Sequence, residues 1–159
     1  MIIRAASAED AVAICAIANP LIRDTVITFT TILRTEDGTR EAITQAEGAF
    51  LVAEEAGQVI GFASYGPFRA GPGYAHTKEH TIQLGPQARG RGIGRALMTR
   101  LEDHARAKGV HVLVGGVSAS NHAGIAFHKN LSFVETGRMP QVGRKFDQLL
   151  DLVLMQKIL

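Results

Sequence analysis

Apolar residues recur along the chain with two different periods, which predict where strands and helices lie. Short β-rich runs predict strands over residues 1–5, 50–54, 58–65, 77–84, 110–117 and 149–154, with another strand beginning at 133. Apolar spacings of three and four predict helices that begin after Ser7, near residue 40, behind the glycines at 90–94 and at Ser120.

Glycine and proline mark several of the boundaries. Asn19-Pro20 interrupts the first helical pattern, which either continues beyond it or gives way to a second short turn. Gly38 is predicted to break the next stretch, and Ala56-Gly57 predicts a hairpin. Neither a repeat nor a linker is evident, so we predict one α+β domain over residues 1–159.

Composition narrows the classes of function. The 159 residues are 46% hydrophobic and 20% charged, with a net charge of +2. No run of Lys or Arg forms a phosphate stripe, so we expect no nucleic-acid partner. Cys15, the sole cysteine, excludes an internal disulfide and is predicted to be buried packing. No signal peptide or membrane-spanning run is seen, so we predict a cytoplasmic protein without a membrane partner.

One glycine-rich turn carries candidate chemistry. Arg89-Gly90-Arg91-Gly92-Ile93-Gly94-Arg95 lies between a predicted strand and a predicted helix. Backbone N–H groups at a helix start attract anions, and glycines let a phosphate approach, so a pyrophosphate is the expected guest. The spacing fits neither a Walker A loop nor a Rossmann fingerprint. Taken alone, a plain turn with solvated arginines remains the alternative.

Three segments, in order, carry a resemblance to a known family. Arg89-x-x-Gly92-x-Gly94 is similar to the pyrophosphate motif of the GNAT acetyltransferases. Asn121, His128 and Leu131-Ser132-Phe133 resemble that superfamily's Asn…Tyr…Leu-Gly-Phe segment, with His in the Tyr place. Thr77-x-Glu79-His80-Thr81-Ile82 and Pro140–Phe146 resemble the phosphinothricin and methionine-sulfone acetyltransferase subfamily.

The resemblance covers nearly the whole chain and implies a function. It implies a single GNAT domain with a mixed, mostly antiparallel sheet flanked by helices, a homodimer, and acetyl-CoA as cofactor. The acetyl group would pass directly to the amine of a small amino-acid-like acceptor. The implied cofactor residues are Ile82, Gln83, Leu84, Arg89, Gly90, Arg91, Gly92, Ile93, Gly94, Arg95, Asn121 and Asn130. The implied acceptor residues are Phe29, Arg69, Ala70, Gly71, Glu79, His80 and Thr81.

Two residues are candidates for proton transfer. Glu79 is the predicted general base, since an alkyl ammonium must lose a proton before it attacks; an ordinary exposed strand carboxylate is the alternative. His128 is the predicted donor to the departing thiolate, and the alternative is a histidine packed on its helix. Arg69 is the predicted partner of an acceptor carboxylate, with Arg144 and Lys145 as alternatives.

The chain also departs from the subfamily. Asp147-Gln148-Leu149 stands where Gly-Arg-Trp is usual, Gln83 replaces a common Tyr, and Ser132 replaces a helix-ending glycine. These differences weaken the prediction of the substrate more than that of acetyl transfer.

Three alternative hypotheses for the function remain. His76-x-x-Glu79-His80 matches an inverted zinc-protease motif, but residues four apart in a strand lie about 13 Å apart and could not share one ion, so we expect no metal. A catalytically silent acyl-CoA-sensing module would keep the glycine turn. An acetyltransferase acting on a protein N-terminus or a polyamine would keep the catalytic residues.

Overall fold

The computed structural model describes residues 1–159 and joins seven strands into one sheet, in the order β1-β2-β3-β4-β5-β7-β6. The strands are β1 (Ile2–Ala5), β2 (Phe50–Glu55), β3 (Gln58–Pro67), β4 (Thr77–Leu84), β5 (Val112–Ser118), β6 (Val134–Lys145) and β7 (Gln148–Ile158). Only β4 and β5 pair in parallel, which confirms the predicted mixed, mostly antiparallel sheet.

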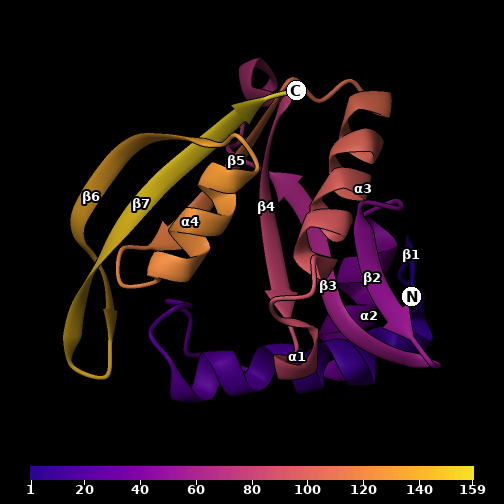
Figure 1. Ribbon diagram of the computed structural model, residues 1–159. Coiled ribbons are helices and arrows are strands. Elements are labelled where there is room, and N and C mark those ends of the chain that lie inside the picture. Colours follow the sequence, from indigo (N-terminus) through magenta and orange to yellow (C-terminus); the bar gives the residue numbers. More distant parts are fainter.

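Four helices cover the two faces of the sheet (Figure 1). They are α1 (Ala11–Asp24), α2 (Glu36–Gln45), α3 (Ile93–Ala107) and α4 (His122–Asn130). Apolar residues of α1 and α2 pack with Phe50, Val52 and Phe62 on one face, while α3 and α4 pack on the larger core of the other. No helix is both long and apolar enough to cross a lipid bilayer.

Strands β4 and β5 run together over only a short stretch. Their pairing is confined to Thr77–Glu79 of β4 and Val112–Val114 of β5. Beyond Glu79 the two strands part, while β4 stays paired with β3 as far as Leu84. Figure 1 shows β4 and β5 close to each other near the top and diverging below, with α1 crossing under them. The edge of β4 from His80 to Leu84 that faces β5 therefore lacks a strand partner.

The structure corrects two predicted helix boundaries and settles a third. Helix α2 begins at Glu36 rather than near residue 40, because the Thr35 hydroxyl accepts a hydrogen bond from the Gly38 N–H (3.0 Å) and caps the helix. Gly38 thus lies inside the first turn and does not break it. Asn121, not Ser120, caps α4. Helix α1 continues through Pro20 to Asp24.

The turns behave as their residues predict. Ala56 and Gly57 both have positive φ, 50° and 77°, as a two-residue hairpin loop between β2 and β3 requires.

Ser132, just after α4, has φ of 68°. A left-handed conformation costs a residue with a Cβ atom about 1 kcal/mol relative to glycine. The helix-ending glycine of the resembled segment is therefore replaced here at an energetic cost.

We expect the substitution Ser132→Gly to raise the free energy of unfolding by about 1 kcal/mol, because it relieves this strain. In a domain of this size that gain corresponds to a rise in Tm of about 2–4 °C in thermal unfolding. Ser120→Gly, at a position without positive φ, is the control and should give no gain. Equal Tm values for the Ser132→Gly and wild-type proteins would contradict the strain argument.

Candidate active site

A cavity of about 950 Å³ opens where β4 and β5 part. Its walls come from the chain after α1, from both diverging strands, from the turn before α3 and from α4. The lining residues discussed below are Thr28, Phe29, Arg34, Glu79, His80, Thr81, Ile82, Gln83, Leu84, Arg89, Gly90, Gly115, Gly116, Ser118, Asn121, Gly124, Phe127 and His128. Segments far apart in the sequence thus meet at one site.

Glu79 is the sole carboxylate that lines this cavity. It ends the paired part of β4 and points over Gly116 of β5, where an added Cβ would lie 3.3 Å from the Glu79 Oε1 atom. It has no ion pair or hydrogen bond within the chain. Partial burial raises the pKa of the carboxyl, even though the side chain stays open to solvent. The site therefore holds an accessible carboxylate with increased basicity.

His80, the next residue, points to the opposite side of β4 and meets His128 of α4. The two Nε2 atoms lie 2.8 Å apart, and the His128 Nδ1 atom lies 2.7 Å from the Gly124 carbonyl oxygen. A carbonyl can only accept, so the His128 Nδ1 carries a proton and donates it to Gly124. In the neutral ring the His128 Nε2 is then an acceptor, and the His80 Nε2–H donates to it.

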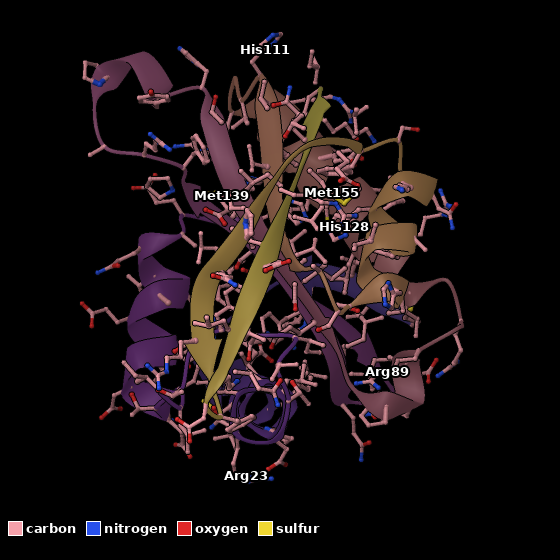
Figure 2. The ribbon with its side chains drawn as sticks, turned by 90° about the vertical axis from the view of Figure 1, so that its left-hand side faces the viewer. Arg23, Arg89, His111, His128, Met139 and Met155 are labelled. Atoms are coloured by element: carbon pink, nitrogen blue, oxygen red, sulfur yellow. The ribbon has the colours of Figure 1, made fainter.

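Burial keeps both rings neutral. It lowers the pKa of His128, and it lowers the pKa of His80 to about 3, with the neighbouring His128 adding to the effect. The His80 Nδ1 atom is buried without a hydrogen-bond partner. Both nitrogens of His128 are engaged within the protein. His128 can give a proton to a ligand only after its bond to His80 breaks, which restricts its predicted role as a proton donor. Figure 2 shows His128 well inside the molecule.

Gly115 of β5 makes room for the histidine pair. An added Cβ at this position would lie 2.9 Å from the His80 Cε1 atom and 3.3 Å from the His128 Nε2 atom. Any residue larger than glycine at this position would therefore force the two rings to shift. Two consecutive glycines in an apolar strand were the sequence signal for such close approaches, at Gly115 from the rings and at Gly116 from Glu79.

The glycine-rich turn has the form that an anion site requires. Gly90 and Gly92 have φ of 70° and 78°, and an added Cβ at either position would meet nothing within 4 Å. The N–H groups of Gly90, Arg91 and Gly92 make no hydrogen bond to the backbone. Gly92 precedes α3, whose dipole favours negative charge at this end. The turn thus offers free donors and open space together.

The three arginines of the turn differ in their placement. Arg89 lines the cavity and lies near the lower edge of the molecule in Figure 2. Arg91 instead pairs with Glu55 (2.9 Å), at the far end of β2, and is thereby drawn toward the neighbouring hairpin. Arg95 donates to the Asn130 carbonyl (3.2 Å) and links α3 to the end of α4. Of the three arginines in this turn, only Arg89 therefore offers an unpaired charge to the cavity.

The two asparagines also separate. Asn121 lines the cavity, and its Oδ1 atom accepts from the Gly124 N–H (2.9 Å), so the capping role and the cavity position coexist. Its Nδ2 group is free to face a ligand. Asn130 lies at the end of α4 outside the cavity lining, and its side chain makes no hydrogen bond.

The predicted acceptor residues fall into two groups. Phe29 and Thr81 line the cavity together with Glu79 and His80. Arg69, Ala70 and Gly71 do not line it. They lie on the exposed loop after β3, where the Arg69 guanidinium stacks over Phe68 (5.5 Å) and Tyr74 (6.0 Å). Sequence reasoning missed Arg34, Ser118 and Phe127, which line the cavity without belonging to any motif.

Comparison with known proteins decides the family. A sequence model of the acetyltransferase (GNAT) family matches residues 19–133. The chain belongs to the GNAT acetyltransferase family. It is 47% identical to an L-methionine sulfoximine/L-methionine sulfone acetyltransferase of Salmonella typhimurium over 67% of this chain and 62% of that protein, so the match spans less than two thirds of the relative's length.

Solved structures agree with this membership. A ribosomal-protein-alanine N-acetyltransferase of Brucella melitensis is 41% identical, with a TM-score of 0.95 and full coverage of both chains. A phosphinothricin acetyltransferase of Sinorhizobium meliloti, solved with acetyl-CoA, is 31% identical, with a TM-score of 0.92 and coverage of 99% of this chain and 88% of that chain. The chain is therefore a GNAT N-acetyltransferase, and its cofactor is acetyl-CoA.

We expect Gly92→Asp to abolish acetyl-CoA binding in a folded protein, because a carboxylate at the start of α3 would repel a phosphate. Isothermal titration with acetyl-CoA measures the effect. Gly57→Asp is the matched control, since Gly57 has nearly the same φ (77°) and equally open surroundings but lies in the β2–β3 hairpin. Unchanged affinity in the Gly92→Asp variant would remove the pyrophosphate assignment.

Proposed function

We propose that this enzyme transfers the acetyl group of acetyl-CoA directly to the amine of a small amino-acid-like acceptor of the methionine sulfone, methionine sulfoximine or phosphinothricin type. The observation that carries this proposal is the unpaired Glu79 carboxylate at the point where β4 and β5 part. The acceptors for which the Salmonella and Sinorhizobium relatives are named support this acceptor class.

In this proposal the unpaired edge of β4 holds the reactive end of the cofactor. Backbone groups of Ile82, Gln83 and Leu84 bind the acetyl and pantetheine part, as an added strand would be bound. Of these residues, Ile82 and Leu84 point their N–H groups away from β3, and these groups are candidate donors to the oxyanion that develops during transfer. Bound acetyl-CoA supplies the acyl group and a thiolate leaving group. The free N–H groups of the glycine turn, with Arg89, receive the pyrophosphate, and Asn121 adds its Nδ2 donor.

Three predicted cofactor residues do not offer a free side-chain group to the cavity. Arg91 is held by Glu55, and Asn130 lies outside the cavity lining, so they contribute to the turn and its packing rather than through free side-chain groups. Arg95 serves the same structural purpose through the Asn130 carbonyl.

Glu79 is the proposed general base. Its pKa is raised by burial, so the ionised carboxylate is a better proton acceptor than that of an ordinary glutamate. A proton taken from the acceptor ammonium leaves an amine able to attack the acetyl carbon. The cavity beside Glu79 contains no second carboxylate, and a polyamine would need one. Acetylation of a protein N-terminus is the second candidate, because the Brucella relative is named a ribosomal-protein-alanine N-acetyltransferase.

The assembly state and the cellular compartment remain predictions. We propose a homodimer formed through the β6–β7 hairpin, because large apolar side chains stand exposed there. They are Met139, Val142, Phe146 and Leu149. We also keep the prediction of a cytoplasmic enzyme without a nucleic-acid or membrane partner.

We expect Glu79→Gln to lower kcat about 10²- to 10⁴-fold, the usual contribution of a general base, with acetyl-CoA binding preserved. Free-thiol release from acetyl-CoA with methionine sulfone, methionine sulfoximine or phosphinothricin is the assay. In the wild type kcat/KM should fall as pH drops through the raised pKa of Glu79, above the range of an ordinary glutamate, because protonation removes the base. This limb should vanish in Glu79→Gln and persist in the surface control Glu36→Gln. Lost cofactor affinity in Glu79→Gln would overturn the assignment.

We expect His128→Gln to lower kcat less than 10-fold, below the range of a lost general acid, because both His128 nitrogens serve the protein. The same variant should lose stability by about 1–3 kcal/mol, since the buried His80 loses its acceptor. Thermal unfolding and steady-state kinetics separate the two effects. A fall of 10² or more in kcat at unchanged stability would instead establish His128 as the proton donor.

A further inference from the structure

The chain between α1 and α2 forms one wall of the cavity, and hydrogen bonds hold this segment at both of its ends. The Asn19 side chain bonds both backbone groups of Arg34 (3.1 and 2.9 Å). The Lys145 ammonium donates to the Thr28 carbonyl (2.8 Å), which ties the segment to β6. Figure 1 shows this segment rising beside the β6–β7 hairpin. Arg34 therefore projects from a fixed backbone rather than from a loose loop.

The Arg34 guanidinium lacks a partner. It stacks over the ring of Phe62, with 5.6 Å to the ring centroid, and makes no hydrogen bond or ion pair within the chain. Burial lowers its pKa, which records desolvation, although an arginine remains charged. Other partly covered arginines are paired, as Arg4 is with Asp10 and Glu54. A half-buried cation with five unused donors is the arrangement of a site that awaits an anion.

A second unsatisfied group lies close by. The Gln83 Oε1 atom is buried and has no hydrogen-bond partner. Gln83 is the cross-strand partner of Phe62, so its side chain shares the face of the sheet on which Arg34 stacks. The Arg34 guanidinium needs a hydrogen-bond acceptor, and the Gln83 Oε1 atom needs a donor. A ligand that carries both an oxyanion and an N–H group would satisfy the two together.

We propose that Arg34 binds an oxyanion of the acceptor substrate and that the Gln83 Oε1 atom accepts a hydrogen bond from an N–H group of the same substrate. The inference rests on the proposed acetyl transfer to an amino-acid-like amine and adds a residue that selects among such amines. Arg34 and Arg89 are the only arginines that line the cavity, and Arg89 belongs to the turn before α3. Arg69, which the sequence predicted as the partner of an acceptor carboxylate, lies outside the cavity lining. The preferred substrates are amines that also bear a carboxylate or phosphinate.

The first arm of the test uses substrates alone. Wild-type kcat/KM for methionine sulfone should exceed that for methionine sulfone amide about 10- to 100-fold, the size expected of a charge-assisted hydrogen bond. Phosphinothricin amide, which keeps the phosphinate, distinguishes the source of the anion. If the kcat/KM of phosphinothricin exceeds that of its amide by the same factor, the α-carboxylate is bound. If phosphinothricin and its amide are equal and both exceed methionine sulfone amide about 10-fold or more, the phosphinate is bound. An acid-to-amide ratio near 1 for both pairs, with equal kcat/KM for the two amides, overturns the proposal.

The second arm uses variants. In Arg34→Met the ratio of kcat/KM for the acid to that for the amide should fall to about 1. Arg34→Lys keeps the positive charge but not the bidentate guanidinium, so it should retain part of the preference. Arg23→Met, on the exposed end of α1, is the control and should keep the wild-type ratio. An unchanged ratio in Arg34→Met, or a rise in KM for acetyl-CoA alone, overturns the proposal.

A binding measurement separates this inference from the proposed function. Calorimetric titration of methionine sulfone and its amide into the CoA-bound enzyme reports the same preference without turnover. Absence of thiol release with every amine, together with tighter binding of the acid that Arg34→Met abolishes, would refute the transferase proposal for these acceptors and keep the Arg34 site. Equal binding of methionine sulfone and its amide, with phosphinothricin amide bound no more tightly than either, would refute the Arg34 site whatever the turnover.

Discussion

The limited pairing of β4 with β5 is the constraint on which the rest of the site depends. Three residue pairs hold the strands together, and the β4 edge beyond Glu79 is then left without a strand partner. Unpaired backbone groups are costly unless water or a ligand satisfies them, so this edge is the proposed binding site for the amide groups of pantetheine. The binding surface arises from an interruption of the sheet rather than from a side-chain motif.

The buried histidine pair occupies the other side of that divergence. His80 and His128 fill the space over Gly115, and the fixed direction of their hydrogen bonds ends at the Gly124 carbonyl. Because both rings are neutral, the pair adds bulk and orientation without charge. Glu79 can then act as the charged group in the middle of the cavity with no cation beside it to depress its basicity.

Much of this arrangement could be predicted from local sequence. The seven strands, the turn at Gly90–Arg95 and the strand position of Glu79 follow from periodicity, glycine spacing and the family resemblance. The start of α2 was misplaced because a Thr35 cap outweighs the helix-breaking tendency of Gly38. The partners of Arg91 and His128 were not predictable, since Glu55 and His80 lie 36 and 48 residues away in sequence and meet only through the tertiary fold.

The proposed sites for cofactor and acceptor lie on different segments, which is consistent with relatives of one fold that are named for different acceptors. In the proposed function the glycine turn and the β4 edge bind the cofactor, whereas the acceptor binds against the chain after α1 and the side chains on one face of β4. A change at Arg34 or Gln83 can therefore alter which anion is recognised without touching the turn or the histidine pair. Since Asn19 and Lys145 already hold this segment in place, its side chains can vary at little cost to the backbone that presents them.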